Sequence, residues 1–409
     1  MTSFQTVLAN SISFNNKRNN SFVNIVMFSL SLLKSLRDGV KLASKYPLDS
    51  RLKVFVDFIS LWRTKGLNPT DYYNFDFLNQ GKDFRTSFLG INEQRLYLDY
   101  LNPVKYYSLS RNKFLAHKIM EGTGIRKTTL YCYFTPEGKV ADSDTIANDL
   151  DGVYSILKEK NVRQCVIKTT ESSHGDNVYV VVKIEFKEND CLFTLFNGKK
   201  SLLSDILSKK TPLLFENLVK QTSQMASFNE SSVNTVRFMT LLYPDNKARL
   251  TATWFKIGRS GKCVDNAGSG GNVDGCVDIE TGELKYVVQF DGWDNVKDIT
   301  HHPDSGALLE GVRIDNWKAI VDQVLRFQES LPYVKAAGWD IAITDDGPVV
   351  IEVNDFWDRT GQLFIRRGWR NEIRDCYLAW KKTGVKYPLQ RQNNPLSKSH
   401  LERIEKKEF

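Results

Sequence analysis

Histidine and cysteine are scarce in this sequence and are poorly placed for metal binding. Its 409 residues include 5 histidines and 6 cysteines, with no C-x-x-C pair and no cysteine at zinc-finger spacing from a histidine. These absences argue against a zinc module, a thioredoxin-like motif and a disulfide framework. We therefore expect buried or free thiols in a reducing compartment, and a cytoplasmic protein.

Signatures of phosphate loops and of nucleic-acid binding are also missing. The sequence has no G-x-x-x-x-G-K-[ST] loop, no arginine-rich run and no aromatic–basic RNA motif, although its net charge is +8. A moderate basic excess without such motifs favours anionic partners such as nucleotides, acidic sugars or a membrane surface, and it argues against nucleic acid.

No apolar run is long enough to cross a membrane. Residues 22–33 (FVNIVMFSLSLL) are apolar, but Asn24 interrupts them and three basic residues follow. The run is shorter than the roughly 18–20 residues that a membrane span needs. We expect a helix that packs on the main body. The alternative is an interfacial helix within residues 22–44 that contacts the inner membrane or glycan-assembly proteins.

The order of expected helices and strands predicts an α+β protein. Apolar periodicity and capping residues indicate the helices, and short β-branched or aromatic runs indicate the strands. The expected helices are residues 21–65, 110–120 with Ser110 as N-cap, 146–160 and 314–331. The expected strands are residues 129–134, 165–168, 177–186, 213–216, 233–242 and 252–257.

A hairpin near the C-terminal end carries the most informative pattern. Two apolar runs flank Thr344-Asp345-Asp346-Gly347, and the Asp-Gly pair is a turn signal. A three-residue loop, with Gly347 in the left-handed position, would place Asp340 directly opposite Glu352. A two-residue loop would put these two carboxylates on opposite faces of the sheet.

The same hairpin predicts a divalent-metal site. Side chains alternate along a strand, so Glu352 and Asn354 share a face. With Asp340 opposite Glu352, two carboxylates and an amide oxygen would meet on one side of an otherwise apolar sheet. Buried carboxylates are costly unless they are paired or bound to metal. A hard cation such as Mg²⁺ accounts for this set.

A lysine and a small polar loop link two of the expected strands. Lys168 ends one strand and leads into residues 169–176 (TTESSHGD), after which the next strand begins. Hydroxyls and backbone amides of such a loop can cradle a phosphate, on which the lysine places a point charge. The alternative is an exposed lysine beside a hairpin connection.

Arg237 interrupts an apolar strand. It alternates with Val236 and Phe238, so its side chain points away from their face. An arginine in that position either pairs with a carboxylate or faces an anion-binding cleft, and the sequence leaves both interpretations open.

Two further segments carry polar side chains of interest. Arg259 precedes a glycine-rich stretch, residues 260–271, which either closes over a ligand or is a flexible connection. His301 and His302 are adjacent and therefore cannot both face one site on a regular helix or strand. This geometry argues against a catalytic histidine pair.

Taken in order, these motifs resemble the ATP-grasp enzymes, and in particular the sugar-transfer-associated ATP-grasp family. The resemblance runs from about Gly66 to Tyr377. Its motifs are L-N-P-T-D-Y-Y-N-F (67–75), Lys113-Phe114, Lys168, L-F-E (214–216), N-T-V-R (234–237), V-D-N (264–266) with Gly270-Gly271, H-P-D-S-G (302–306), G-W-D-I-A (338–342) and I-E-V-N (351–354). The D…E-x-N arrangement is the most specific, because the fold uses it to hold Mg²⁺ against ATP phosphates.

The resemblance implies an ATP-grasp fold in which the nucleotide is held between two α+β lobes. The implied nucleotide-binding residues are Lys113, Lys168, Ser172, Ser173, His174, Gly175, Glu216, Asn217 and Leu218. The implied metal ligands are Asp340, Glu352 and Asn354, and the implied catalytic residues are Arg237, Arg259 and Lys168. The loop E-S-S-H-G-D departs from the family in having a single glycine.

The resemblance also implies a division of the chain. The segments are an N-terminal helical region (1–65), a region that precedes the fold (66–127), a small lobe (128–220), a catalytic lobe with the Mg²⁺ site (221–387) and a polar tail (388–409). We expect the tail to be frayed or lightly docked.

The function that the resemblance implies is that of an ADP-forming carboxylate–amine ligase with an acyl-phosphate intermediate. The substrates would be a small-molecule or sugar-linked carboxylate and an amine such as an amino acid, in cell-surface polysaccharide or glycoconjugate biosynthesis. One alternative is a phosphotransferase that acts on a hydroxyl acceptor. Another is a nucleotide-binding partner at the membrane without catalytic activity.

Overall fold

The computed structural model describes residues 20–137, 144–171, 178–263, 271–292 and 295–385. The chain divides into two compact units, Met1–Leu96 with Arg391–Phe409, and Tyr97–Gln390. Among the described residues, no helix combines the length and the apolar character needed to cross a bilayer. The predicted polar tail lies outside these residues, as do the loop residues Ser172 to Gly175.

The first unit is helical. Its elements are α2 (Asn20–Ala43), α3 (Arg51–Lys65), α4 (Pro69–Asn74), α5 (Lys82–Ser87) and the first part of α6 (Ile91–Leu101). Two helices joined by a turn therefore replace the single helical region expected over 21–65. The two helices pack closely at Gly39, where an added Cβ would lie 3.1 Å from the Phe58 ring. Gly66 ends α3 with a φ of 65°, a conformation that glycine adopts without strain.

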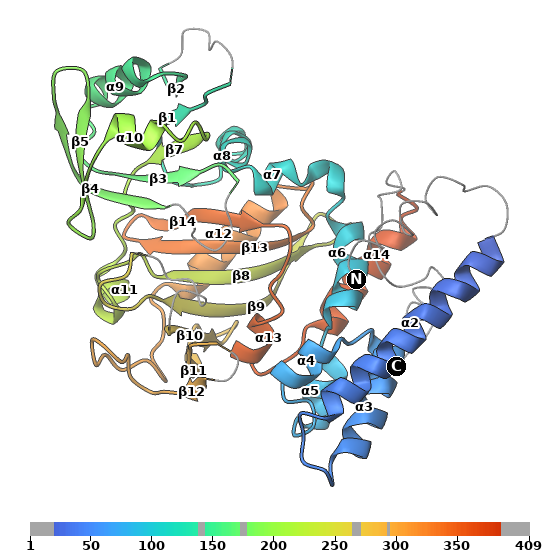
Figure 1. Ribbon diagram of the computed structural model, residues 1–409. Coiled ribbons are helices and arrows are strands. Elements are labelled where there is room, and N and C mark those ends of the chain that lie inside the picture. The colour runs from blue at the N-terminus through green and yellow to red at the C-terminus, as the bar shows by residue number, and fades with distance from the viewer. Residues whose placement is uncertain (1–19, 138–143, 172–177, 264–270, 293–294, 386–409) are drawn as a thin grey trace. The chain divides into compact units, whose positions relative to one another are not determined.

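The second unit contains two mixed α/β layers (Figure 1). The smaller layer, or small lobe, has the strand order β2-β1-β7-β3-β4-β5-β6. Its strands are β1 (Leu130–Phe134), β2 (Ile146–Ala147), β3 (Cys165–Thr169), β4 (Tyr179–Phe186), β5 (Cys191–Leu195), β6 (Lys200–Leu202) and β7 (Leu213–Glu216). Its helices are α9 (Leu150–Glu159) and α10 (Leu203–Leu207). Helix α8 (Lys113–Gly122) precedes this layer, and its residues Ala116 and Met120 belong to the buried cluster of the larger layer.

Helix α8 begins later than the sequence predicted. The Asn112 side chain accepts a hydrogen bond from the amide of Leu115 at 3.0 Å, so Asn112 is the N-cap and Ser110 is not. Ser110 instead belongs to the short helix α7 (Ser108–Arg111), which follows the 3₁₀ turn η1 (Val104–Tyr106). This cap places Lys113 at the first position of α8.

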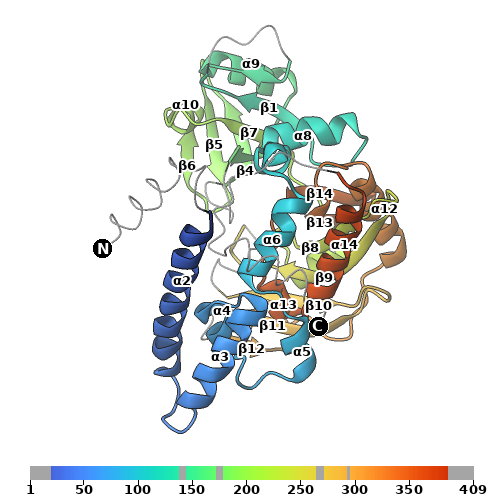
Figure 2. The same cartoon turned by 90° about the vertical axis from the view of Figure 1, so that its right-hand side faces the viewer.

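The larger layer, or large lobe, has the strand order β12-β11-β10-β9-β8-β13-β14. Its strands are β8 (Thr235–Leu242), β9 (Ala248–Ile257), β10 (Asn272–Val277), β11 (Leu284–Phe290), β12 (Val296–Asp298), β13 (Ala336–Thr344) and β14 (Gly347–Asn354). Its helices are α11 (Ser223–Phe228), α12 (Trp317–Glu329), α13 (Gly361–Phe364) and α14 (Arg370–Lys382). Figure 2 shows the same elements from the side.

Strand alternation gives the large sheet two different faces. One face is apolar and packs against α12, with Val236, Ile341 and Val324 in a single buried cluster. Arg237 is next to Val236 on β8, and Asp340 is next to Ile341 on β13, so both side chains point to the other face of the sheet. There the two residues are paired across β8 and β13. The sheet thus has a hydrophobic face that stabilises the fold and a polar face that is available for a site.

The hairpin β13–β14 confirms the predicted pairing of Asp340 with Glu352, but its turn differs from the prediction. Thr344 pairs with Gly347, so the loop has two residues and not three. A β-bulge between Asp340 and Ile341 supplies the missing residue on β14 and restores the register. Gly347 has a φ of 107°, a positive value as expected.

Candidate active site

A cavity of about 500 Å³ is lined by both lobes of the second unit. The small lobe contributes an apolar wall formed by Val166, Val178, Val180, Val182 and Phe196. Val166 and Lys168 are two residues apart on β3, so the same strand face supplies both the apolar wall and a positive charge. The large lobe contributes Thr235, Lys256, Asp340, Ile351 and Glu352.

Lys168 and Glu216 form a nearly buried ion pair at the small-lobe side. The Lys168 ammonium donates a hydrogen bond to the Glu216 carboxylate at 3.0 Å, and their side chains are 13% and 6% exposed. Strand β3 pairs directly with β7, which brings the two side chains together. Glu216 therefore fixes the position of Lys168 at the cavity, in preference to the exposed-lysine alternative.

Lys113 reaches across the cavity to the large lobe. Its ammonium lies 3.4 Å from a Glu352 carboxylate oxygen. The backbone amide of Lys113 also donates to the carbonyl of Thr170 at 3.0 Å, which ties the start of α8 to the end of β3. Glu352 is 34% exposed, so this carboxylate stays open to solvent and to a ligand in the cavity.

The Asp340 carboxylate is paired with two cations of the large lobe. Arg237 grips the carboxylate with Nε and Nη2, the latter at 2.8 Å, and the Lys256 ammonium lies 3.5 Å away. Burial by itself would raise the pKa of Asp340, but Arg237 and Lys256 outweigh it and hold the pKa below its ordinary value. Burial likewise acts to lower the pKa of Arg237, and Asp340 raises it above the usual range.

The pairing of Arg237 with Asp340 decides between the two interpretations that the sequence left open. Arg237 is absent from the described residues that line the cavity, and it lies behind the Asp340 carboxylate. Its placement is that of a residue that positions Asp340. The catalytic role expected for Arg237 stays a prediction.

Arg259 is braced outside the cavity by Asp304. Its Nε and Nη2 atoms each donate to the Asp304 carboxylate at 2.7 Å, and the amide of Ser260 donates to the same group at 2.8 Å. The hydrogen bond from Arg259 lowers the pKa of Asp304 to about 2. This pair joins the start of the glycine-rich stretch to the H-P-D-S-G loop, and it gives Arg259 a structural partner.

His302 is part of the same brace. Its Nε2 atom lies 3.0 Å from the carbonyl of Gly258, and Nδ1 accepts hydrogen bonds from the amides of Asp304 and Ser305. This pattern requires a neutral ring with the proton on Nε2. Burial lowers the pKa of His302, in agreement with that tautomer.

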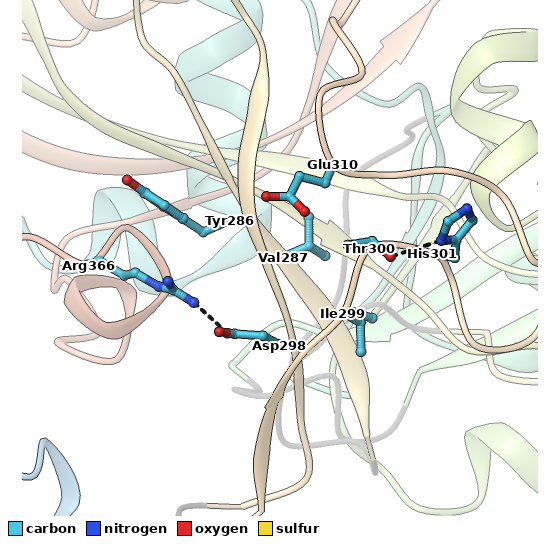
Figure 3. Close-up of a pocket in the computed structure, with 8 residues that line it drawn as sticks. All are labelled: Tyr286, Val287, Asp298, Ile299, Thr300, His301, Glu310 and Arg366. Atoms are coloured by element: carbon cyan, nitrogen blue, oxygen red, sulfur yellow. Dashed lines mark hydrogen bonds and ion pairs between the residues drawn. The ribbon is translucent and has the colours of Figure 1, made fainter.

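His301 lies elsewhere, among the residues that line a surface cavity of about 490 Å³ beside β11 and β12 (Figure 3). There its Nδ1 atom lies 2.9 Å from the Thr300 hydroxyl, while Arg366 pairs with Asp298 and covers the Tyr286 ring. The two adjacent histidines therefore lie in different surroundings. Of the predicted site residues that the structure describes, none lines this second cavity.

The structure brings together most, but not all, of the predicted residues that it describes. Lys113, Lys168, Asn217, Leu218, Asp340 and Glu352 line the first cavity, and Glu216 contacts it through Lys168. Asn354 is not among its lining residues and donates to the carbonyl of Gly338 at 3.4 Å. Among the described residues, no group of three or more His, Cys, Asp or Glu side chains is placed to hold a metal ion.

Sequence reasoning missed Lys256. This lysine lies on β9 with its side chain 6% exposed, and it pairs in register with Thr235. The available signal was the same as for Arg237, a basic residue inside the apolar strand A-T-W-F-K-I. Lysine is almost never fully buried unless it is paired, so this position predicts a nearby carboxylate.

A family model for sugar-transfer associated ATP-grasp proteins matches residues 92–376, more than two thirds of the chain. The chain belongs to the sugar-transfer associated ATP-grasp family. Its α+β architecture is that of the ATP-grasp fold, as the sequence predicted. Because the chain belongs to an ATP-grasp family, the cavity lined by both lobes is the candidate nucleotide-binding site.

Several solved structures are also similar to this family member. Biotin carboxylase from Campylobacter jejuni, solved with an ATP analogue, is 9% identical, with a TM-score of 0.39 over 72% of this chain and 50% of that one. D-alanine–D-alanine ligase from Bacillus anthracis is 12% identical, with a TM-score of 0.36 over 68% and 70%. The chain thus spans half the length of the first of these. No curated protein sequence matches it.

Proposed function

We propose that this protein is an ATP-dependent carboxylate–amine ligase that releases ADP. The observation that carries the proposal is the cavity between the lobes, which is lined by an apolar wall, by the cations Lys113, Lys168 and Lys256, and by the carboxylates Asp340 and Glu352. A purine base needs apolar surface, and a polyphosphate needs clustered cations. The membership of the chain in an ATP-grasp family supports this assignment.

The proposed nucleotide contacts follow from the two walls. The base would pack on the valine-rich wall, next to the chain segment Glu216 to Leu218. The ammonium groups of Lys113 and Lys168 would neutralise phosphate charge. Ser172, Ser173, His174 and Gly175 are proposed to cover the polyphosphate, on the family pattern alone.

Asp340 and Glu352 are the proposed protein ligands of a magnesium ion. They face one another across neighbouring strands and both line the cavity. Mg²⁺ in nucleotide sites is bound by one or two protein carboxylates, with water and substrate phosphates completing its shell. A bound ion would neutralise the charge that develops on the transferred phosphoryl group. Asn354, as the proposed third ligand, would have to turn from its hydrogen bond to Gly338.

The proposed reaction has two balanced steps. A carboxylate oxygen of the first substrate attacks the γ-phosphorus of ATP, the bond to the β-phosphate oxygen breaks, and ADP leaves. An amine then attacks the resulting acyl phosphate, loses a proton and expels inorganic phosphate, which leaves an amide. Such transfer relies on positioning and charge neutralisation, which Lys168, Lys256 and the Arg237–Asp340 pair are arranged to supply.

The proposed setting is cytoplasmic and concerns cell-surface polysaccharide or glycoconjugate biosynthesis. The family description refers to sugar transfer. A uronic acid or a similar sugar-linked carboxylate would supply the acid, and an amino acid would supply the amine. The domain division at residues 65/66, 127/128, 220/221 and 387/388 is proposed on the same family basis.

The test is ADP release by the purified full chain, with uronic acids and amino acids offered in pairs in the presence of Mg²⁺. A ligase requires both substrates and releases free phosphate. Glu352→Gln should lower the Mg²⁺-dependent rate by about 10²-fold or more, because a proposed ligand of the charge-neutralising Mg²⁺ is lost. Glu280→Gln, on an exposed turn of the same lobe, is the matched control.

Other outcomes would replace the proposal. If the phosphate remains on a hydroxyl acceptor, the protein is a phosphotransferase. If the chain binds ATP with Mg²⁺ but does not hydrolyse it in the presence of any acceptor tested, the result supports the alternative of a non-catalytic nucleotide-binding protein. An unchanged rate for Glu352→Gln would remove the proposed metal site.

A further inference from the structure

The turn between α2 and α3 exposes apolar side chains to an unusual degree. Leu48 is 80% exposed and Leu52 is 75% exposed, which are the highest values for large apolar side chains among the described residues. Val56, one turn further along α3, is 57% exposed. Residues four apart lie on one face of a helix, so Leu52 and Val56 form one stripe that Leu48 extends into the turn.

This stripe is turned away from the core of its own unit. The opposite face of α3 carries the buried Val54, Phe58, Leu61 and Trp62. Helix α3 is held by that face and by its close approach to α2 at Gly39. The exposed stripe is therefore a fixed feature of a packed helix, and both views place the turn at the far end of the two helices (Figures 1 and 2).

The helical segment that carries the stripe is rich in basic residues. Residues 32–66 contain eight lysines and arginines against three aspartates, although the net charge of the whole chain is only +8. The basic excess is thus concentrated here and not spread along the chain. Lys45, Arg51 and Lys53 flank Leu48 and Leu52, and Asp49 is the single acidic residue between positions 45 and 56.

We propose that the α2–α3 turn docks on an anionic phospholipid surface. Leu48, Leu52 and Val56 would enter the boundary between headgroups and acyl chains, and Lys45, Arg51 and Lys53 would contact the lipid phosphates. The basic residues next to the apolar stripe in the chain favour this occupant, because a purely apolar contact would not require them. The docking residues 45–56 lie entirely outside the 22–44 segment that the sequence suggested for membrane contact.

The test is co-sedimentation of the full-length protein with vesicles. Vesicles with phosphatidylglycerol and phosphatidylcholine should bind the protein, and vesicles of phosphatidylcholine alone should bind it at least about tenfold more weakly. Leu48→Glu/Leu52→Glu should lower binding to the anionic vesicles by about tenfold or more. Lys45→Glu/Lys53→Glu should also lower binding to the anionic vesicles. A higher salt concentration should likewise lower the binding of the wild-type protein.

Matched controls separate this surface from general charge and hydrophobicity. Val104→Glu changes a residue of the other unit that is 50% exposed, and Lys318→Glu reverses an exposed charge on α12. Both should bind like the wild type. Circular dichroism checks that each variant is folded.

Three results would overturn the proposal. The first is absence of binding to anionic vesicles, and the second is undiminished binding by Leu48→Glu/Leu52→Glu. The third is a dimer in sedimentation equilibrium that the same variant dissociates without any vesicle binding, which would assign the stripe to a second copy of the chain.

Discussion

Arg237 and Arg259 each grip an aspartate with two nitrogen atoms, but the two pairs lie in different environments. Arg237 and Asp340 are 12% and 6% exposed and belong to the centre of the large sheet. Arg259 and Asp304 are 24% and 22% exposed and join two loops. Similar geometry therefore has different consequences, because burial removes the water that would otherwise replace a lost partner.

The two arginine–aspartate pairs also have different roles in the structure. The Arg237–Asp340 pair holds a carboxylate at the cavity, where Lys256 adds a second positive charge. The Arg259–Asp304 pair fixes loop segments whose anchors include the buried ring of His302. The Arg237–Asp340 pair thus positions charged groups at the cavity, and the Arg259–Asp304 pair stabilises the conformation of the two loops that it joins.

The largest expected difference concerns stability. Arg237→Met leaves Asp340 buried with Lys256 alone, and we expect the free energy of unfolding to fall by about 3–5 kcal/mol. Arg259→Met leaves Asp304 close to water, so we expect a loss of about 0–1 kcal/mol. Urea unfolding followed by tryptophan fluorescence measures both. Equal losses would show that burial does not distinguish the two pairs.

The next expected difference concerns turnover and depends on the proposed function. Lys256→Met should lower kcat by about 10²-fold, because a cation is lost from the cavity wall. Arg259→Met should change kcat by less than about threefold, on the ground that Asp304 holds this side chain away from the cavity. A loss for Arg259→Met as large as that for Lys256→Met would instead support the catalytic role that the sequence suggested for Arg259.

The smallest expected effect is a pH dependence at His302. Its pKa is lowered in the folded state, so below about pH 6.5 the unfolded chain binds a proton that the folded chain does not. Stability should therefore fall as the pH drops from about 6.5 towards the folded pKa, by at most about 1.4 kcal/mol per pH unit. Urea midpoints at pH 7.5 and 5.5 measure this loss.

A matched variant isolates that contribution. His302→Gln removes the titrating group and should show a smaller acid loss than the wild type. His117→Gln is the comparison at another buried histidine of the same unit, whose pKa burial also lowers. An acid loss unchanged in His302→Gln would place the proton uptake elsewhere.

The hairpin shows how far local sequence rules extend. The apolar runs and the Asp-Gly signal predicted two antiparallel strands, and the pairing of Asp340 with Glu352 was correct. The reason given for the pairing was wrong, since a two-residue turn and a bulge replace the three-residue loop. The bulge depends on how β14 pairs with β13, and no local residue preference in the sequence predicted it.

The cavity cations show a different limit. Alternation along β8 predicted that Arg237 leaves the apolar face, but it could not name Asp340 as the partner, which lies more than 100 residues away. The same alternation applied to β9 would have found Lys256. The family resemblance implied a catalytic role for Arg259, and the sequence could not place Asp304 against this side chain.

The sequence by itself determined the family, the positions of several helices and strands, and the paired carboxylates of the hairpin, because these depend on short-range periodicity and on contiguous motifs. Tertiary structure alone decided which charges meet. Strand order brought Lys168 to Glu216 and both Arg237 and Lys256 to Asp340, and helix packing turned Leu48 and Leu52 outward. Burial and partner choice arise from contacts between distant segments, and a linear pattern does not contain them.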